Sequence, residues 1–158
     1  MRRSDREIKE FDEIVDVIKR CDVCRLAFQD GDYPYILPLN FGVQTEKEQI
    51  TLFFHSALTG KKMELMQRDN RVSFEMDCAH ELFTDDREMS CSMAYESVMG
   101  HGRIEMVPET EKYDALVCLM EHYHKGDFPF DQRVIPRTAV YKLVVETVTG
   151  KRRKRKIL

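Results

Sequence analysis

Residues 35–42 read YILPLNFG and residues 51–62 read TLFFHSALTGKK, and these two stretches decide the fold. Each begins as an apolar run typical of a β-strand, and the first is interrupted by Pro38. Because proline has no N–H to donate to a sheet, the strand that holds it must be irregular or lie at a sheet edge. Gly60 and the two lysines after it open a helical stretch, where free N–H groups and ammonium groups suit a phosphate. The two stretches together predict exposed backbone beside a phosphate-binding turn, and therefore a nucleotide-like cofactor.

The composition is that of one globular domain. The chain has 158 residues, of which 42% are hydrophobic and 34% are charged. No apolar run approaches the length that spans a bilayer, and the first residues lack the apolar core of a signal peptide. We therefore expect a cytoplasmic protein without a membrane partner.

Basic residues gather at the C-terminus, where residues 151–156 are all Lys or Arg. Without these six residues the body carries 19 basic against 28 acidic side chains, a net charge of about −9. Such a body is a poor surface for nucleic acid. We expect a single domain over residues 1–150, a solvated basic tail over residues 151–158, and no nucleic-acid partner.

Neither the cysteines nor the histidines form a metal motif. Cys21 and Cys24 have the spacing of a zinc or redox pair, but no second pair exists to complete a zinc site. They also follow a predicted helix, at the end where the helix dipole disfavours a thiolate. On a helix, His122 and His124 point to different sides and cannot easily chelate one ion. We expect no metal site and structural thiols.

Hydrophobic periodicity divides the chain into six strands and three helices. We expect strands at residues 23–28, 33–43, 50–55, 71–76, 93–107 and 138–146, and helices at residues 7–19, 59–67 and 108–123. Residues 77–90 are polar and predict a loop, while Gly100 and Gly102 predict a bulge in the fifth strand. Thr59 is the expected N-cap of the second helix. In the third helix the residues expected to face inward are Tyr113, Leu116, Val117 and Met120. The short turns and the lack of a repeating βαβ pattern predict a mainly β fold, an antiparallel barrel with peripheral helices.

The order of four segments resembles the FMN-binding split-barrel family, the relatives of pyridoxamine 5′-phosphate oxidase, and within it the branch of 5-nitroimidazole-resistance (Nim-type) proteins. The segments are residues 24–27 with 33–41, residues 54–57 with 60–62, residues 95–105, and residues 140–143 with 149–151. They span nearly the whole chain in the family's order. The resemblance implies a six-stranded antiparallel split β-barrel with peripheral helices. It also implies a homodimer that holds FMN, or else FAD, in grooves between its subunits.

The resemblance also implies the candidate site. The cofactor-binding candidates are Leu37, Pro38, Leu39, Asn40, His55, Ser56, Gly60, Lys61, Lys62, Ser97, Tyr123 and His124. The turn at residues 60–62 would hold the flavin phosphate, and the sequence does not separate its two lysines. The main chain of residues 37–40 would follow the flavin ring, where the Asn40 amide can both donate and accept. Residue 97 lies on the strand given to the dimer groove, and Tyr123 or His124 would stack on or cap the flavin of the partner. His55 is the catalytic candidate, because an imidazole titrates near neutrality and can deliver a proton.

The implied function is a flavin-dependent oxidoreductase that passes electrons to a small-molecule acceptor such as a 5-nitroimidazole. A non-catalytic flavin-binding protein or redox sensor is the alternative, since it needs the same contacts. Pyridoxamine phosphate oxidation is disfavoured, because those enzymes end with an Arg-Leu-x-Pro motif and this chain ends in GKRRKRKIL. A haem-binding relative stays open, since the histidines do not exclude it.

Overall fold

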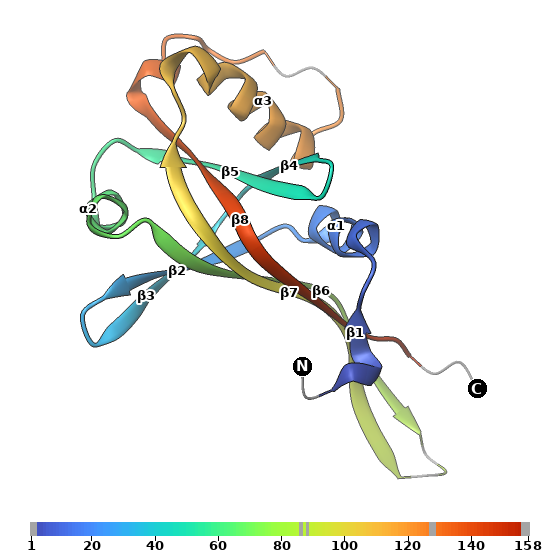
Figure 1. The fold of residues 1–158 in the computed structure, drawn as a ribbon. Helices are drawn as coiled ribbons and strands as arrows, with labels where there is room; N and C mark the ends of the chain where they lie inside the picture. The colour runs from blue at the N-terminus through green and yellow to red at the C-terminus, as the bar shows by residue number, and fades with distance from the viewer. Residues whose placement is uncertain (1–2, 86, 88, 127–128, 156–158) are drawn as a thin grey trace.

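The computed structural model describes residues 3–85, 87, 89–126 and 129–155. Within these ranges eight strands form one sheet in the order β3-β2-β6-β7-β8-β5-β4, and β1 pairs with β8 outside this path (Figure 1). The strands are β1 (Glu7–Ile8), β2 (Cys24–Asp30), β3 (Tyr33–Leu39), β4 (Gly42–Glu46), β5 (Gln49–Ala57), β6 (Arg71–Asp85), β7 (Ser90–Met106) and β8 (Thr138–Arg153). The helices are α1 (Phe11–Arg20), α2 (Lys61–Arg68) and α3 (Lys112–Tyr123), with 3₁₀ turns at Ser4–Arg6, Glu109–Glu111 and Ile135–Arg137.

The sheet closes on itself because its two edge strands are neighbours in the chain. β3 and β4 stand at opposite ends of the strand order, yet only Asn40 and Phe41 lie between them. The three Cα–Cα steps from Leu39 to Gly42 span at most about 11 Å, so the two edges must approach each other and the sheet curls into a split β-barrel. This confirms the predicted fold class. The predicted strand at residues 33–43 is in fact two strands, which, together with the short β1, raises the count from six to eight.

The barrel is filled by alternating side chains. In β2 the inward residues Cys24, Leu26 and Phe28 are buried, while the residues between them are exposed or half-buried. The same alternation in β5 buries Leu52 and Phe54. These side chains join one core cluster with α1 and the inner face of β8. The period-two pattern used to predict the strands is therefore the pattern that packs the barrel.

Helix α3 lies across β4 and β5, and its inward face is rotated relative to the prediction. Of the residues predicted to face inward, Leu116 is buried and Val117 and Met120 are half-buried, but Tyr113 is not. Tyr113 is 44% exposed, and the buried residues are Lys112, Ala115, Leu116 and Leu119. The reason is a close approach to β4. A Cβ on Gly42 would lie 2.6 Å from the Leu119 backbone nitrogen, so the missing side chain lets this turn of the helix rest directly on the strand.

The segment predicted as a loop at residues 77–90 is mostly strand. β6 and β7 continue their antiparallel pairing as far as Asp85 and Ser90, and they leave the barrel as a two-stranded ribbon (Figure 1). The prediction was wrong because the ribbon has few apolar side chains, while its backbone hydrogen bonds come from the partner strand. The predicted bulge is confirmed between His101 and Gly102, where a Cβ on Gly102 would lie 2.0 Å from the Val144 carbonyl oxygen.

Both ends of the chain add to the sheet. Glu7 and Ile8, expected to be helical, pair instead with Lys151 and Gly150. β8 extends to Arg153, so it runs into the segment predicted as a tail. Of that segment, residues 156–158 lie outside the described ranges. No helix among the described residues is long and apolar enough to cross a membrane.

Candidate functional site

Helix α2 begins without a side-chain cap. Its N-cap is Gly60 rather than the predicted Thr59, and no side chain accepts a hydrogen bond from the first turn. Gly60 has a φ of 127°, a conformation that favours glycine. The next two amides, those of Lys61 and Lys62, are the first positions of the helix and have no carbonyl one turn before them. The helix start therefore presents unused N–H groups, as predicted for residues 60–62.

The two lysines at this start have different surroundings. The ammonium of Lys61 lies 2.5 Å from the Asp30 carboxylate and 5.0 Å from the centre of the Tyr35 ring. Its hydrogen bond to Asp30 is the main reason why the pKa of that carboxyl is held below its ordinary value. The Asp30 carboxylate, at the end of β2, thus compensates the positive charge of Lys61.

Lys62 lacks such compensation. It is half-buried, and among the described residues it has no carboxylate within ion-pair distance. Its ammonium lies 5.3 Å from the centre of the Tyr141 ring. Burial lowers the pKa of Lys62 below the ordinary value for a lysine, and no neighbouring charge offsets this effect. A cation in this position fits an incoming anion, so the structure separates two lysines that the sequence could not.

His55 and Ser56 end β5 beside this lysine. Partial burial, and then the positive charge of Lys62, hold the pKa of His55 below its ordinary value. The Ser56 hydroxyl donates to the Ala57 carbonyl at 3.0 Å and lies 3.8 Å from the Met63 sulfur on α2. The structure therefore brings His55, Ser56, Gly60 and Lys62 together, on two elements joined by one short turn.

Tyr141 is the residue of this region to which the sequence assigned no role. It lies on β8 with none of its surface exposed, and its ring stacks on Phe54 at 5.6 Å between centres. Its hydroxyl is the one buried side-chain N or O atom in the described structure without a hydrogen-bond partner. A lone tyrosine in the apolar run AVYKLVV was the signal that could have drawn attention to it.

The β3 strand lies at a sheet edge, as Pro38 predicted. In the described part of the chain it pairs only with β2, so one side of its backbone has no strand partner there. Leu37 and Leu39 turn toward the core and are half-buried, while Pro38 is exposed on the outer face. The Asn40 amide nitrogen lies 3.5 Å from the Asp22 carbonyl oxygen. This edge can offer backbone groups to a planar ligand.

The other candidates lie elsewhere or have structural contacts. The Tyr123 hydroxyl accepts from the Phe41 amide at 3.0 Å and donates to the Asp22 carbonyl at 2.8 Å, which fixes the end of α3 to the barrel. His124 is exposed, with its Nδ1 3.3 Å from the Gly126 carbonyl oxygen. Ser97 pairs with Lys151, which lies ten residues along β8 from Tyr141, a path of at most about 33 Å at strand spacing. Ser97 therefore does not join Lys62 within one chain.

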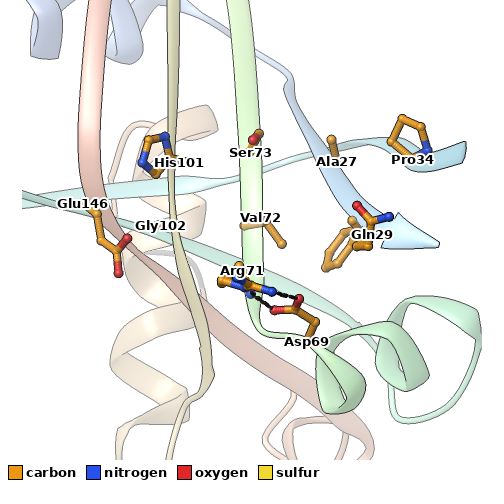
Figure 2. Close-up of a pocket in the computed structure, with 11 residues that line it drawn as sticks. Ala27, Gln29, Pro34, Asp69, Arg71, Val72, Ser73, His101, Gly102 and Glu146 are labelled. Carbon is orange, nitrogen blue, oxygen red and sulfur yellow. Dashed lines mark hydrogen bonds and ion pairs between the residues drawn. The ribbon is translucent and has the colours of Figure 1, made fainter. Parts of the chain in front are cut away.

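A groove of about 490 Å³ crosses the outer face of β2, β6, β7 and β8 (Figure 2). Its charged side chains are paired: Arg71 donates to Asp69 at 2.6 Å, and Glu146 accepts from Arg103 at 2.9 Å. It contains none of the predicted site residues. The candidate site is thus formed by the free edge of β3 and the start of α2, and not by this groove.

The protein is therefore a split β-barrel in which the first turn of α2 offers free N–H groups and the Lys62 ammonium to an anion. The sequence matches the family described as pyridoxamine 5'-phosphate oxidase over residues 10–152, and the chain belongs to that family. No curated protein gives a significant sequence match.

Several solved structures are similar. A candidate 5-nitroimidazole antibiotic resistance protein from Bacteroides thetaiotaomicron has 33% identity and a TM-score of 0.81, covering 92% of this chain and 85% of its own. An FAD- and haem-binding protein from Mycobacterium smegmatis has 13% identity and a TM-score of 0.82, covering 95% and 74%. An FAD-binding protein from Mesorhizobium loti has 23% identity and a TM-score of 0.66, covering 94% and 98%. At their low identities the last two similarities show the fold alone.

Proposed function

We propose that this protein binds a flavin, with the flavin phosphate at the start of α2 against Lys62. The observation that carries the proposal is the uncompensated ammonium of Lys62 beside the uncapped amides that follow Gly60. A phosphate there would accept hydrogen bonds from the helix start and neutralise a charge that has no carboxylate partner. The residues present therefore fit the group that the family's chemistry requires.

The free edge of β3 supports a place for the flavin ring. Leu37, Pro38 and Leu39 offer main-chain groups on a strand side that no other strand uses, and the Asn40 side chain adds a donor and an acceptor. FMN is the proposed cofactor because its single phosphate matches a single uncompensated lysine. FAD is the second candidate, and it is supported by the ligand named for the Mesorhizobium loti protein.

His55 is the proposed proton donor. In the free protein partial burial and Lys62 favour its neutral form. A bound phosphate would screen Lys62 and thereby raise the pKa of His55, so that cofactor binding would prepare the imidazole to donate. The bound flavin would supply the redox chemistry, and this chain would supply binding, orientation and the proton.

A small acceptor such as a 5-nitroimidazole is the proposed substrate class. The similarity to the Bacteroides thetaiotaomicron protein over most of both chains supports this choice. The second candidate function is non-catalytic flavin binding, as in a store or redox sensor. It is supported by the similarity in fold to the Mesorhizobium loti protein, which is named as FAD-binding.

A homodimer is the proposed assembly. Ser97 is too far from Lys62 to contact the same ligand within one chain, so its proposed flavin contact would need a second copy. Apolar side chains on the outer sheet face are available for such an interface: Ile36 is 60% exposed and Met99 is 57% exposed. Sedimentation should give about twice 18.7 kDa. A monomer that binds flavin fully would contradict the shared site.

The test of the function begins with the visible spectrum of the purified protein. Mass analysis of the released cofactor then separates FMN from FAD. Anaerobic stopped-flow follows, in which the bound flavin is reduced, a 5-nitroimidazole is added, and reoxidation is recorded for the wild type and His55→Ala. We expect His55→Ala to keep the flavin and to slow reoxidation by about 10²–10⁴-fold. Equal rates would remove His55 from the mechanism, and no reoxidation in either would leave only the binding function.

A further inference from the structure

We propose that Tyr141 is a positioning residue, whose ring holds the Lys62 ammonium charged and directed at the start of α2, in the place that a carboxylate usually takes. The value of this arrangement for phosphate binding rests on the function proposed above. The arrangement itself is a property of the flavin-free protein.

The geometry is that of a cation–π contact. The Lys62 ammonium lies 5.3 Å from the centre of the Tyr141 ring, within the distance of about 6 Å at which the electron-rich ring face attracts a cation. Lysine side chains are flexible, and an ammonium without a partner would sample many rotamers. A rigid aromatic surface under the charge reduces this freedom without neutralising it, as a carboxylate would.

Tyr141 is well fixed for this role. It is fully buried near the start of β8, and its ring stacks on Phe54 at 5.6 Å with 18° between the ring planes. Neighbouring strands hold the backbone on both sides, since β8 pairs with β5 and β7 at this position. The ring therefore cannot move away when a ligand approaches the lysine.

The two lysines provide an internal contrast. Lys61 also lies over a tyrosine, with its ammonium 5.0 Å from the centre of the Tyr35 ring, but Lys61 has the Asp30 carboxylate as well. Only for Lys62 is the ring the main source of compensation. The other groups around Lys62 do not replace it: from β5 it faces His55, and its own helix carries Lys61 and Glu64.

The hydroxyl of Tyr141 is not the group that acts on Lys62. Among the described residues this hydroxyl has no hydrogen-bond partner. Phenylalanine keeps the ring and removes the unpaired hydroxyl. Tyr141→Phe should therefore preserve the contact, and Tyr141→Leu should abolish it.

The experiment is a pH titration of the Lys62 13Cε resonance in flavin-free protein, assigned by its loss in Lys62→Arg. We expect Tyr141→Leu to lower the protonation constant of Lys62 about two- to fivefold, which corresponds to a cation–π contact at the weaker end of the usual range. Tyr141→Phe should titrate like the wild type. Tyr35→Leu, which removes the other ring, is the matched control and should leave Lys62 unchanged. If Tyr141→Leu does not fold, Tyr141→Met fills the space with a side chain that has no ring.

An unchanged Lys62 titration in the ring-less variant would overturn the proposal, and so would an equal fall in Tyr141→Phe. Flavin affinity of the same variants then tests the proposed function separately. If the protonation constant falls while the flavin affinity is unchanged, the positioning role of Tyr141 is supported. The proposed contact between Lys62 and the flavin phosphate is then wrong.

Discussion

Two clusters of charge at opposite ends of β8 differ in how they are compensated. At the C-terminal end, the Glu96 carboxylate binds the guanidinium groups of both Arg20 and Arg152, and Arg152 also contacts Glu13 at 3.1 Å. At the other end, Lys62 lies over the Tyr141 ring and has no acid among the described residues. The first cluster is complete within the chain and fastens α1 to β7 and β8. The second lacks a counter-charge among the described residues, and it is there that we propose the phosphate site.

The largest effect is expected when the cluster around Glu96 is broken. Glu96 is only 14% exposed at its side chain, and Glu96→Gln would leave two guanidinium groups facing each other. We expect a loss of about 2–3 kcal/mol in the free energy of unfolding, somewhat below the cost of breaking a fully buried pair. Urea denaturation at pH 7 measures it. The matched control is Glu146→Gln at the exposed Arg103 pair, where the change should stay below about 1 kcal/mol.

The pH dependence of the complete cluster has a definite sign. Burial opposes ionisation of Glu96, but the two guanidinium groups outweigh it and hold the pKa of that carboxyl below its ordinary value. The contribution of Glu96 is therefore fully present above the pKa of an unfolded glutamate. It is lost as the pH falls through the lowered pKa of the folded state. Glu96→Gln and the wild type should converge in stability as the pH is lowered.

The next effect concerns flavin affinity, and it compares Lys62 with Lys61. Lys62→Met should weaken flavin binding at least about tenfold, because a charge-assisted phosphate contact is worth roughly 1.5–3 kcal/mol. Lys61→Met is the matched control and should cost less, since Asp30 already engages that ammonium. Fluorescence titration measures both affinities. Equal losses, or a larger loss in Lys61→Met, would reverse the assignment of the two lysines.

The sequence predicted the barrel but not the ribbon that leaves it, and it named both lysines as candidates without distinguishing between them. Strand alternation and Pro38 give the barrel strands and the free edge, because those features follow from backbone chemistry at single positions. The outward ribbon of β6 and β7 escapes such reasoning, since its strands are paired without being buried. The difference between Lys61 and Lys62 depends on Asp30 and Tyr141, which are distant in sequence from the helix start. The extension of β8 into the basic segment is likewise a tertiary effect, in which β1 and β7 recruit Lys151 into the sheet.

The smallest expected effect concerns the coupling between His55 and Lys62. The positive charge of Lys62 is the second cause, after burial, of the lowered pKa of His55, so Lys62→Met should raise that pKa toward its ordinary value. Because the folded pKa of His55 is lowered, His55 opposes folding as the pH falls below the ordinary histidine pKa, and Lys62→Met should relieve part of this loss. A titration of the His55 ring protons by NMR follows the first effect, and thermal unfolding between pH 7 and pH 5.5 follows the second. Saturating phosphate should shift His55 of the wild type in the same direction, because an anion at Lys62 screens the same charge. If neither the substitution nor the phosphate changes the pKa of His55, the charge of Lys62 does not act on His55. The proposed link between cofactor binding and proton donation would then be wrong.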